Sequence, residues 1–395
     1  MTPEHAIRPD DTSIPHTVSS EPFDPYSVEQ LSPEQERYFL ASQWKMMWWR
    51  FLRHRLAVIS GAFLLLLYVA ILFCEFLAPY GAGTRDRQSQ SSFVPPQPVH
   101  VFDRGEFIGP FVYGYDLKRN QITLKPEYFP NPAKVEKLRF FCRGEKYEFW
   151  GLFEGRLHLF CPAENTTVHI LGTDKLGHDL LSRLIYGARI SLTIGLFGVT
   201  LSFLLGIVIG GIAGYYGGWT DILIQRFIEV IQSFPHLPLW MALSAVLPVT
   251  WSPILVYFGI TLILGMIEWT HLARAVRSKL LALREEDFCT AAVLMGATPA
   301  RIIGRHLLPS FMSHLIASAT LVIPGMILGE TALSFLGLGL RPPITSWGVL
   351  LNEAQNISVV ALYPWLMLPV VPVILTVLAF NFFGDGLRDA ADPYH

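Results

Sequence analysis

The sequence predicts an all-α polytopic membrane protein with six transmembrane helices and a small β-containing extracytoplasmic insertion after the first helix. Apolar residues make up 51% of the chain, which suits a membrane protein that also carries soluble parts. A polar stretch at 79–186 separates the first apolar run from the second. Six runs are long enough to cross a bilayer as helices, at 56–78, 190–214, 227–249, 254–272, 311–336 and 361–383.

The segment before the first run divides into two parts. Residues 1–31 are rich in Pro, Ser, Asp and Glu and lack the pattern of a signal peptide, so we expect a disordered cytoplasmic tail. Residues 32–55 are expected to form an interfacial amphipathic helix, because Ser32 and Gln35 have capping-box spacing and Trp, Lys and Arg alternate after them. A soluble amphipathic helix is the alternative.

Basic residues orient the spans, because Lys and Arg are enriched in short cytoplasmic loops. Those before the first run place the N-terminus in the cytoplasm. A five-helix core at 187–386 then puts the loop at 273–310 and the C-terminal tail at 387–395 in the cytoplasm. In the outer loop at 337–360, Arg341 is the only basic residue. The inner loop holds Arg274, Arg277, Lys279, Arg284, Arg301 and Arg305.

The insertion at 79–186 contains short aromatic-rich runs at 138–141, 146–153 and 156–160, broken by glycines. Such runs predict a small antiparallel sheet. Cys142 follows the first run and Cys161 follows the last, and a disulfide between them would close the sheet in an oxidising compartment. Two separate buried thiols are the alternative.

The stretch at 284–309 reads REEDFCTAAVLMGATPARIIGRHLLP and predicts a helix, a glycine break and a second helix. Acidic residues at 285–287 complement the dipole of the first helix, and Thr298-Pro299 is a typical start for the second. Small residues at 291, 292 and 296 leave one face nearly bare, so that this face can enter a groove on a partner. An ordinary charged loop is the alternative.

The segment at 171–192 reads LGTDKLGHDLLSRLIYGARISL, and we interpret it as structural. Thr173 and Asp174 can cap a helix, and Asp179 has the helical spacing for a salt bridge with Arg183. His178 has no base or nucleophile spaced near it, so a catalytic role is not expected.

Three features lie inside the apolar runs. Gly206, Gly210, Gly211 and Gly214 form a small-residue face suited to helix packing. Prolines 235, 238 and 248 interrupt the third run. Glu330 is an intramembrane carboxylate, and we favour a structural role in which a neighbouring helix satisfies it over a functional one.

Several of these stretches together resemble the permease subunits of dipeptide and oligopeptide ATP-binding-cassette (ABC) importers, specifically the second, C-type permease. Ala291, Ala292, Gly296 and Pro309 match the EAA…G…LP loop of such permeases, with Thr290 and His306 as departures. The segment at 171–192 is similar to LGTDxxGRDxxSRxxxGxRxSL, with His178 in place of Arg. Stretches at 329–348 and 381–393 extend the resemblance.

The resemblance implies a type I ABC importer permease in a bacterial inner membrane, with both termini cytoplasmic. It implies these partners: a second homologous permease subunit, two ABC ATPase subunits, a periplasmic solute-binding protein and the lipid bilayer. ATP and Mg would be bound by the ATPases, so this chain would be neither an enzyme nor a cofactor protein. The expected ATPase-docking residues are Glu285, Glu286, Asp287, Ala291, Ala292, Gly296, Arg301 and Pro309.

Other function classes fit the sequence less well. The chain has no phosphate loop of the G-x-x-x-x-G-K-[ST] kind, no metal-ligand spacing and no basic stripe for nucleic acid. A secondary transporter would show paired repeats with midplane ionisable residues, and a membrane enzyme would need a catalytic cluster. If the chain belongs to an importer, oligosaccharides or other small solutes are the alternative to peptides as its substrates.

Overall fold

The computed structural model describes residues 40–85, 92–103, 105–119, 121, 126–163 and 166–391. The tail expected at 1–31 and the capping box at Ser32 lie outside the described residues. The chain divides into two units, 1–46 and 47–395, and the fold described below belongs to the second. Helix α2 (Gln43–Arg53) ends in Arg50 and Arg53, and His54 caps the next helix by accepting a hydrogen bond from the Ala57 N–H.

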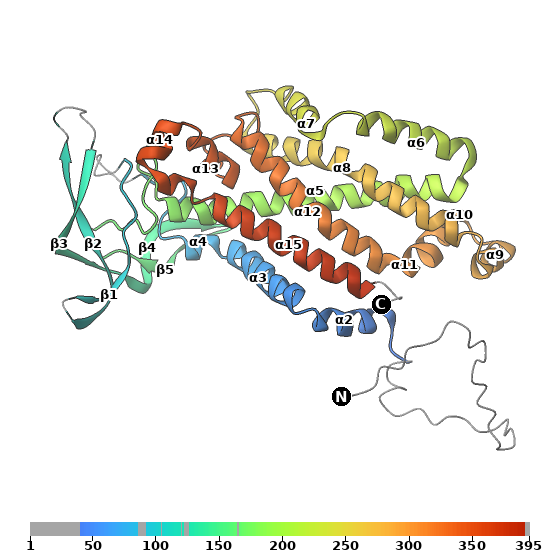
Figure 1. Ribbon diagram of the computed structural model, residues 1–395, viewed down its shortest axis with the longest axis horizontal. Coiled ribbons are helices and arrows are strands. Elements are labelled where there is room, and N and C mark those ends of the chain that lie inside the picture. The colour runs from blue at the N-terminus through green and yellow to red at the C-terminus, as the bar shows by residue number, and fades with distance from the viewer. Residues whose placement is uncertain are drawn as a thin grey trace, which may run out of the picture. The chain divides into compact units, whose positions relative to one another are not determined.

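Within the described part, five helical segments are long and apolar enough to cross a membrane. They are α3 (Arg55–Leu72), α5 (Leu180–Tyr216), α8 (Pro253–Leu283), α12 (Met312–Phe335) and the segment Pro364–Ala391, which joins η2 (Pro364–Met367) to α15 (Val370–Ala391). Figure 1 shows these helices running side by side. A polytopic helical membrane protein is therefore the correct fold class.

The third apolar run, expected as one helix at 227–249, is instead divided between α6 (Gly218–Gln232) and α7 (His236–Ala245). The break falls at Pro235, which precedes α7 at its N-cap position. Proline lacks the N–H that would continue the helical hydrogen-bond ladder. The expectation of six continuous spanning helices is therefore not met by the described helices.

Helix α8 continues to Leu283, eleven residues beyond the end predicted at 272, so the loop expected at 273–310 begins later, at Arg284. Residues 273–283 contain neither Gly nor Pro, and Ala273, Val276 and Leu280 are all fully buried. That i, i+3, i+7 spacing gives the helix end an apolar face to bury. At the other side of the molecule α3 stops at Leu72, and a single turn, α4 (Cys74–Leu77), completes the run expected at 56–78.

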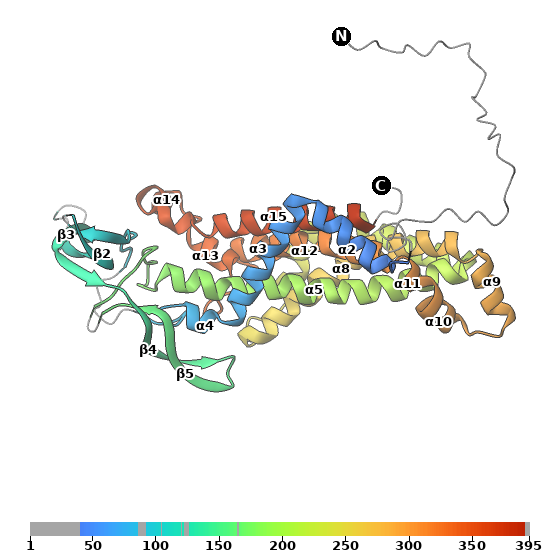
Figure 2. The same cartoon turned by 90° about the horizontal axis from the view of Figure 1, so that it is seen from below.

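The insertion holds five strands in two antiparallel sheets: β1 (His100–Asp103), β2 (Glu106–Arg119) and β3 (Pro126–Lys137) form one, and β4 (Arg139–Phe149) and β5 (Phe153–Cys161) the other. The two-stranded sheet covers the runs predicted at 138–160. The three-stranded sheet was missed, because its strands contain Gly and Pro at positions such as Gly114 and Pro130 that obscure alternation. Figure 2 shows the β4–β5 hairpin turning back alongside α4.

Three short elements follow α12: α13 (Trp347–Glu353), α14 (Ile357–Leu362) and η2. They connect α12 to α15. Trp347 is buried and donates its indole N–H to the carbonyl of Leu184 on α5, 3.2 Å away. This contact fixes the connection between α12 and α15 against the N-terminal part of α5.

Candidate functional site

The segment at 284–309 folds as helix α9 (Asp287–Leu294), a turn at Gly296, and a second helical stretch. That stretch comprises α10 (Pro299–Arg301), η1 (Ile302–Leu307) and α11 (Leu308–Ser310). Gly296 has φ +80°, the left-handed conformation that favours glycine after a helix. The Thr298 hydroxyl accepts a hydrogen bond from the Arg301 N–H, and Pro299 is the first residue of α10, as predicted.

One side of α9 packs into the protein. Cys289 and Ala292 are buried in a cluster with Leu280 of α8 and with Ile302 and Leu307 of η1. Burial of about 25 cal/mol for each Å² of apolar surface favours this docking. Helix α9 is thus anchored to the end of α8 rather than suspended on a loose loop.

The other side of α9 is exposed and apolar. Leu294 and Met295 are 83% and 80% exposed, and Phe288 and Val293 are also exposed. Of the residues predicted to form a bare face, Ala291 and Gly296 are exposed, but Ala292 is only 2% exposed and faces its own chain. Consecutive helical residues point about 100° apart, so two adjacent alanines do not share one face. The exposed surface is built from large apolar side chains beside Ala291.

The remaining predicted docking residues surround this surface without forming a cluster. Glu285, Glu286 and Asp287 are exposed, with Glu286 at the N-cap of α9 and Asp287 as its first residue. Their carboxylates lie at the positive end of the helix dipole. Arg301 and Pro309 are exposed on the second helical stretch.

Two arginines secure the base of this segment. Arg277 of α8 forms a bidentate ion pair with Asp221 of α6. Arg284, which follows α8, donates to the carbonyl of Tyr215 near the end of α5, 3.5 Å away. The ends of α5, α6 and α8 are therefore tied together next to α9.

The segment at 171–192 is held by a buried carboxylate, that of Asp174. One of its oxygens accepts from the N–H groups of Leu176 and His178, at 2.7 and 2.9 Å. The other lies 2.7 Å from His178 Nδ1 and is paired with Arg183. Arg183 also reaches Glu353 of α13, 3.0 Å away. Asp174, His178 and Arg183 thus form one network that joins the turn before α5 to α13.

The structure corrects two details of this segment. Asp179, not Thr173 or Asp174, is the N-cap of α5, and its carboxylate accepts from the Ser182 N–H at 2.8 Å. Asp179 is therefore occupied at the cap, and Arg183 pairs with Asp174 instead of Asp179. The Thr173 hydroxyl accepts a hydrogen bond from the N–H of Val94, which precedes β1 in the insertion, at 2.8 Å.

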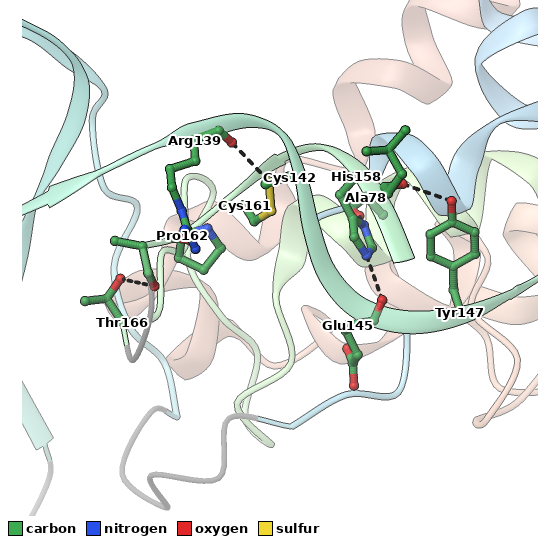
Figure 3. The surroundings of a disulfide bond; sticks show 11 residues. Ala78, Arg139, Cys142, Glu145, Tyr147, His158, Cys161, Pro162 and Thr166 are labelled. Atoms are coloured by element: carbon green, nitrogen blue, oxygen red, sulfur yellow. Dashed lines mark hydrogen bonds between the residues drawn. A yellow bond between two sulfur atoms is a disulfide. The ribbon is translucent and has the colours of Figure 1, made fainter. Parts of the chain in front are cut away.

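Cys142 and Cys161 are joined by a disulfide across the β4–β5 hairpin, with their Cα atoms 6.2 Å apart (Figure 3). Nearby, His158 of β5 is buried, and its ring bridges two backbone carbonyls. Its Nδ1 atom lies 2.6 Å from the oxygen of Ala78, and Nε2 lies 2.9 Å from that of Glu145. The hairpin is therefore fixed both internally and to the chain that follows α4.

Two further acidic side chains make polar contacts between elements, and of the two only Glu330 was singled out from the sequence. Glu353 pairs with Arg183 although 170 residues separate them, and no local pattern signals such a pair. Glu330 of α12 is fully buried and accepts from the hydroxyls of Ser191, Ser334 and Ser346, at 2.9, 2.8 and 2.6 Å. Partners from α5 and from the start of α13 match the structural role favoured for this carboxylate. Among the residues that the structure describes, no group of three His, Cys, Asp or Glu is placed to hold a metal ion.

The fold and these sites define a class of protein: a helical membrane subunit with an anchored, apolar-faced helix beyond its spanning segments. The family described as "Binding-protein-dependent transport system inner membrane component" matches residues 206–394. The family described as "N-terminal TM domain of oligopeptide transport permease C" matches residues 42–96.

Curated relatives agree. The oligopeptide transport system permease protein OppC of Haemophilus influenzae is 41% identical over 57% of this chain and 70% of its own length. The dipeptide transport system permease protein DppC of Alkalihalophilus pseudofirmus is 41% identical over 57% of this chain and 72% of its own. The glutathione transport system permease protein GsiD of Pectobacterium atrosepticum is 32% identical over 89% of this chain and 91% of its own.

The chain therefore belongs to the binding-protein-dependent transport permeases of the inner membrane, in the branch that includes the oligopeptide and dipeptide permeases. The family predicted from the motifs is confirmed. As a permease, the chain belongs to the membrane component of a transport complex and not to its ATPase component.

Proposed function

We propose that this chain is one of two permease subunits of a bacterial ABC importer and that it forms the path for oligopeptides or dipeptides with a second, homologous permease. The names of three relatives support this substrate class, since those proteins are permeases for oligopeptides, dipeptides and glutathione. The observation that carries the proposal is the exposed apolar side of α9, which a solvent-facing loop would not need.

The occupant of that surface is one of two ABC ATPase subunits, which bind ATP and Mg outside this chain. An apolar helix face with acidic residues at one end fits a groove on a partner. Because Cys289 and Ala292 anchor α9 to α8 and η1, displacement of α9 by closing ATPases is transmitted to packed helices. Rigid-body rocking of the two permeases then opens the path toward the other side.

The proposed orientation places α9 and both termini in the cytoplasm. Basic residues near the end of α8 support it, among them Arg274, Arg277 and Lys279. In this arrangement α6 and α7 together make the third of six crossings, with the break between them at Pro235.

The strands of the insertion then lie in the periplasm. In Figure 1 they are at the opposite end of the spanning helices from α9. This position suits contact with a periplasmic solute-binding protein that delivers the substrate. The Asp174–Arg183–Glu353 network lies between the insertion and the helices and fixes the geometry of that end.

The test is purification of the tagged chain from its native membrane in a mild detergent, with mass-spectrometric identification of the proteins that accompany it. The expected result is a second permease and ABC ATPase subunits in stoichiometric amounts. A lone chain in several detergents contradicts the importer. As a matched control, Leu294→Glu should lose the ATPases while keeping the second permease.

A further inference from the structure

The tip of the β4–β5 hairpin, residues 149–153, is an apolar surface that has no role in the proposed transport function. Its sequence is Phe149-Trp150-Gly151-Leu152-Phe153, without a charged side chain. Leu152 is 80% exposed, and Trp150 and Phe153 are exposed as well. Exposed apolar side chains at a hairpin tip cost free energy in water unless something covers them.

The tip lies at the level where α3 ends. The indole N–H of Trp150 donates to the carbonyl of Leu72, the last residue of α3, 3.0 Å away. The backbone N–H of Trp150 also faces Glu75, at 3.4 Å. Trp150 and Gly151 both adopt positive φ, and the turn they form holds the tip against α3. Figure 2 shows the hairpin curling back toward these helices.

The length of α3 locates that level in a membrane. Its 18 residues extend about 27 Å at about 1.5 Å each, close to the thickness of about 30 Å of a hydrocarbon core. Leu72 therefore lies where the helix leaves the hydrocarbon. Tryptophan is enriched at this depth because its ring is apolar while its N–H needs a polar partner.

The charged residues around the tip lie where the boundary between hydrocarbon and headgroups is expected. Arg189 of α5 lies 4.9 Å from the Trp150 ring and pairs with Glu75, as a cation at the headgroup level would. On the strands, the charged residues resume directly behind the tip, where Lys146 pairs with Glu154 at 3.5 Å. An apolar end followed by charge is the distribution of a segment that lies in the membrane interface.

The exposed surface of the tip continues that of α3. Leu72 and Phe73 are exposed beside Trp150, and the exposed residues Leu65, Leu66 and Val69 extend the same helix away from the insertion. A spanning helix meets lipid with such residues. The tip thus extends a lipid-facing surface rather than forming an isolated patch.

We propose that the hairpin tip at 149–153 inserts into the bilayer interface and anchors the insertion to the lipid surface. The occupant is lipid, at the boundary between headgroups and acyl chains. The anchor fixes the two sheets relative to the spanning helices independently of any substrate or ATPase.

The test uses the complete complex with Leu152→Cys, labelled with an environment-sensitive fluorophore and reconstituted in bilayers with or without lipids brominated near the headgroup. The matched control is Phe107→Cys, a site 71% exposed and equally apolar, in β2 of the other sheet. Signal from a labelled parent chain is subtracted, because Cys74 and Cys289 remain as buried thiols.

Brominated lipid is expected to quench the probe at residue 152 at least about twofold more than at residue 107, as for a group about 5–10 Å into the interface. Equal fluorescence in both bilayers overturns the proposal, and so does equal quenching at the two sites. A second subunit covering the tip would leave the probe unquenched and would also overturn it. Phe153→Cys repeats the test if the first variant does not assemble.

Discussion

Gly210 of α5 lies so close to the backbone of Ala273 in α8 that a β-carbon on Gly210 would overlap the Ala273 carbonyl oxygen. Gly206 meets Leu272 and Gly214 meets Arg277 and Leu280 in the same way. Three glycines of the predicted small-residue face, Gly206, Gly210 and Gly214, therefore form the contact between the two longest described helices, whereas Gly211 lies nearest Ile303 of η1.

Gly210→Ala is expected to push α5 and α8 apart and to destabilise the chain by about 1–3 kcal/mol, the usual effect of overpacking. Thermal unfolding of the purified complex measures this. Gly211→Ala is the matched control, because its β-carbon would lie 3.6 Å from Ile303, an ordinary contact distance. Equal melting temperatures for the two variants would contradict the proposed packing role.

Arg183→Gln removes the cation that pairs with the buried carboxylate of Asp174 and the half-buried carboxylate of Glu353. Removal of one member of a buried ion pair costs about 3–5 kcal/mol, so we expect a lower midpoint of unfolding. The double variant Asp174→Asn/Arg183→Gln removes both charges and should recover part of the loss. A double variant as unstable as the sum of its single changes would show that the pair is not coupled.

Gly296→Val places a β-branched residue at φ +80°, which costs about 1–2 kcal/mol for an ordinary side chain. We expect α9 to shift and peptide uptake to fall, with membrane insertion unchanged. Apart from residues 295–297, no described residue lies within 4 Å of the added β-carbon, so any steric effect beyond the backbone strain comes from a partner. Uptake and ATPase activity of the complete importer are the measurements.

Asn tolerates positive φ better than Val, so Gly296→Asn separates the two causes. Uptake restored by Asn assigns the defect to backbone conformation, whereas a defect shared by both variants assigns it to a tight groove on the ATPase. Gly304→Val is the control on the same segment, since its surroundings are also open and its φ is not positive. Normal uptake by Gly296→Val would argue against a coupling role for this turn.

Burial raises the pKa of Glu136 in β3, and the charges of Lys134 and His169 oppose this shift only in part. Its Oε2 atom is buried without a hydrogen-bond partner among the described residues. Because the folded state holds this proton more tightly than the unfolded state, Glu136 favours folding at low pH. That contribution disappears as pH rises from the unfolded pKa through the folded pKa.

Glu136→Gln should therefore flatten the pH dependence of the stability of the β1–β2–β3 sheet in the weakly acidic range. Hydrogen exchange of the β2 and β3 amides, corrected for the intrinsic rate at each pH, reports that stability. The exposed residue Glu127 provides the control, Glu127→Gln. An identical pH profile for the wild type and Glu136→Gln would contradict the assignment.

Local sequence patterns correctly predicted features that depend on only a few neighbouring residues. Thr298-Pro299 starts a helix, Gly296 ends one, and the glycines of α5 face a neighbour, because capping, positive φ and helical spacing act over a few residues. Five of the six apolar runs similarly predicted where helices of spanning length lie in the described part, whereas the third is broken at Pro235 and α8 extends past its predicted end.

Contacts between residues that lie far apart in the sequence could not be predicted from it. Arg183 had Asp179 at helical spacing, yet it pairs with Asp174 and Glu353, because Asp179 is used by the helix cap. The side of α9 that faces outward depends on which residues dock against η1, so Ala292 was misplaced on the exposed face. The strands β1–β3 carry Gly and Pro that hide the alternating pattern.

If ATPases drive peptide import by acting on the exposed apolar side of α9, uptake depends on that surface. The most direct measurement is ATP-dependent uptake of radiolabelled di- and oligopeptides by proteoliposomes that contain the complete importer, with Leu294→Glu and Val249→Glu as a matched pair. Leu294 and Val249 are 83% and 81% exposed, but Val249 lies between α7 and α8. ATP-dependent uptake is expected to fall at least about tenfold, or about 1.4 kcal/mol, in Leu294→Glu alone. Wild-type uptake by Leu294→Glu, or no ATP-dependent peptide uptake by the intact complex, would contradict it.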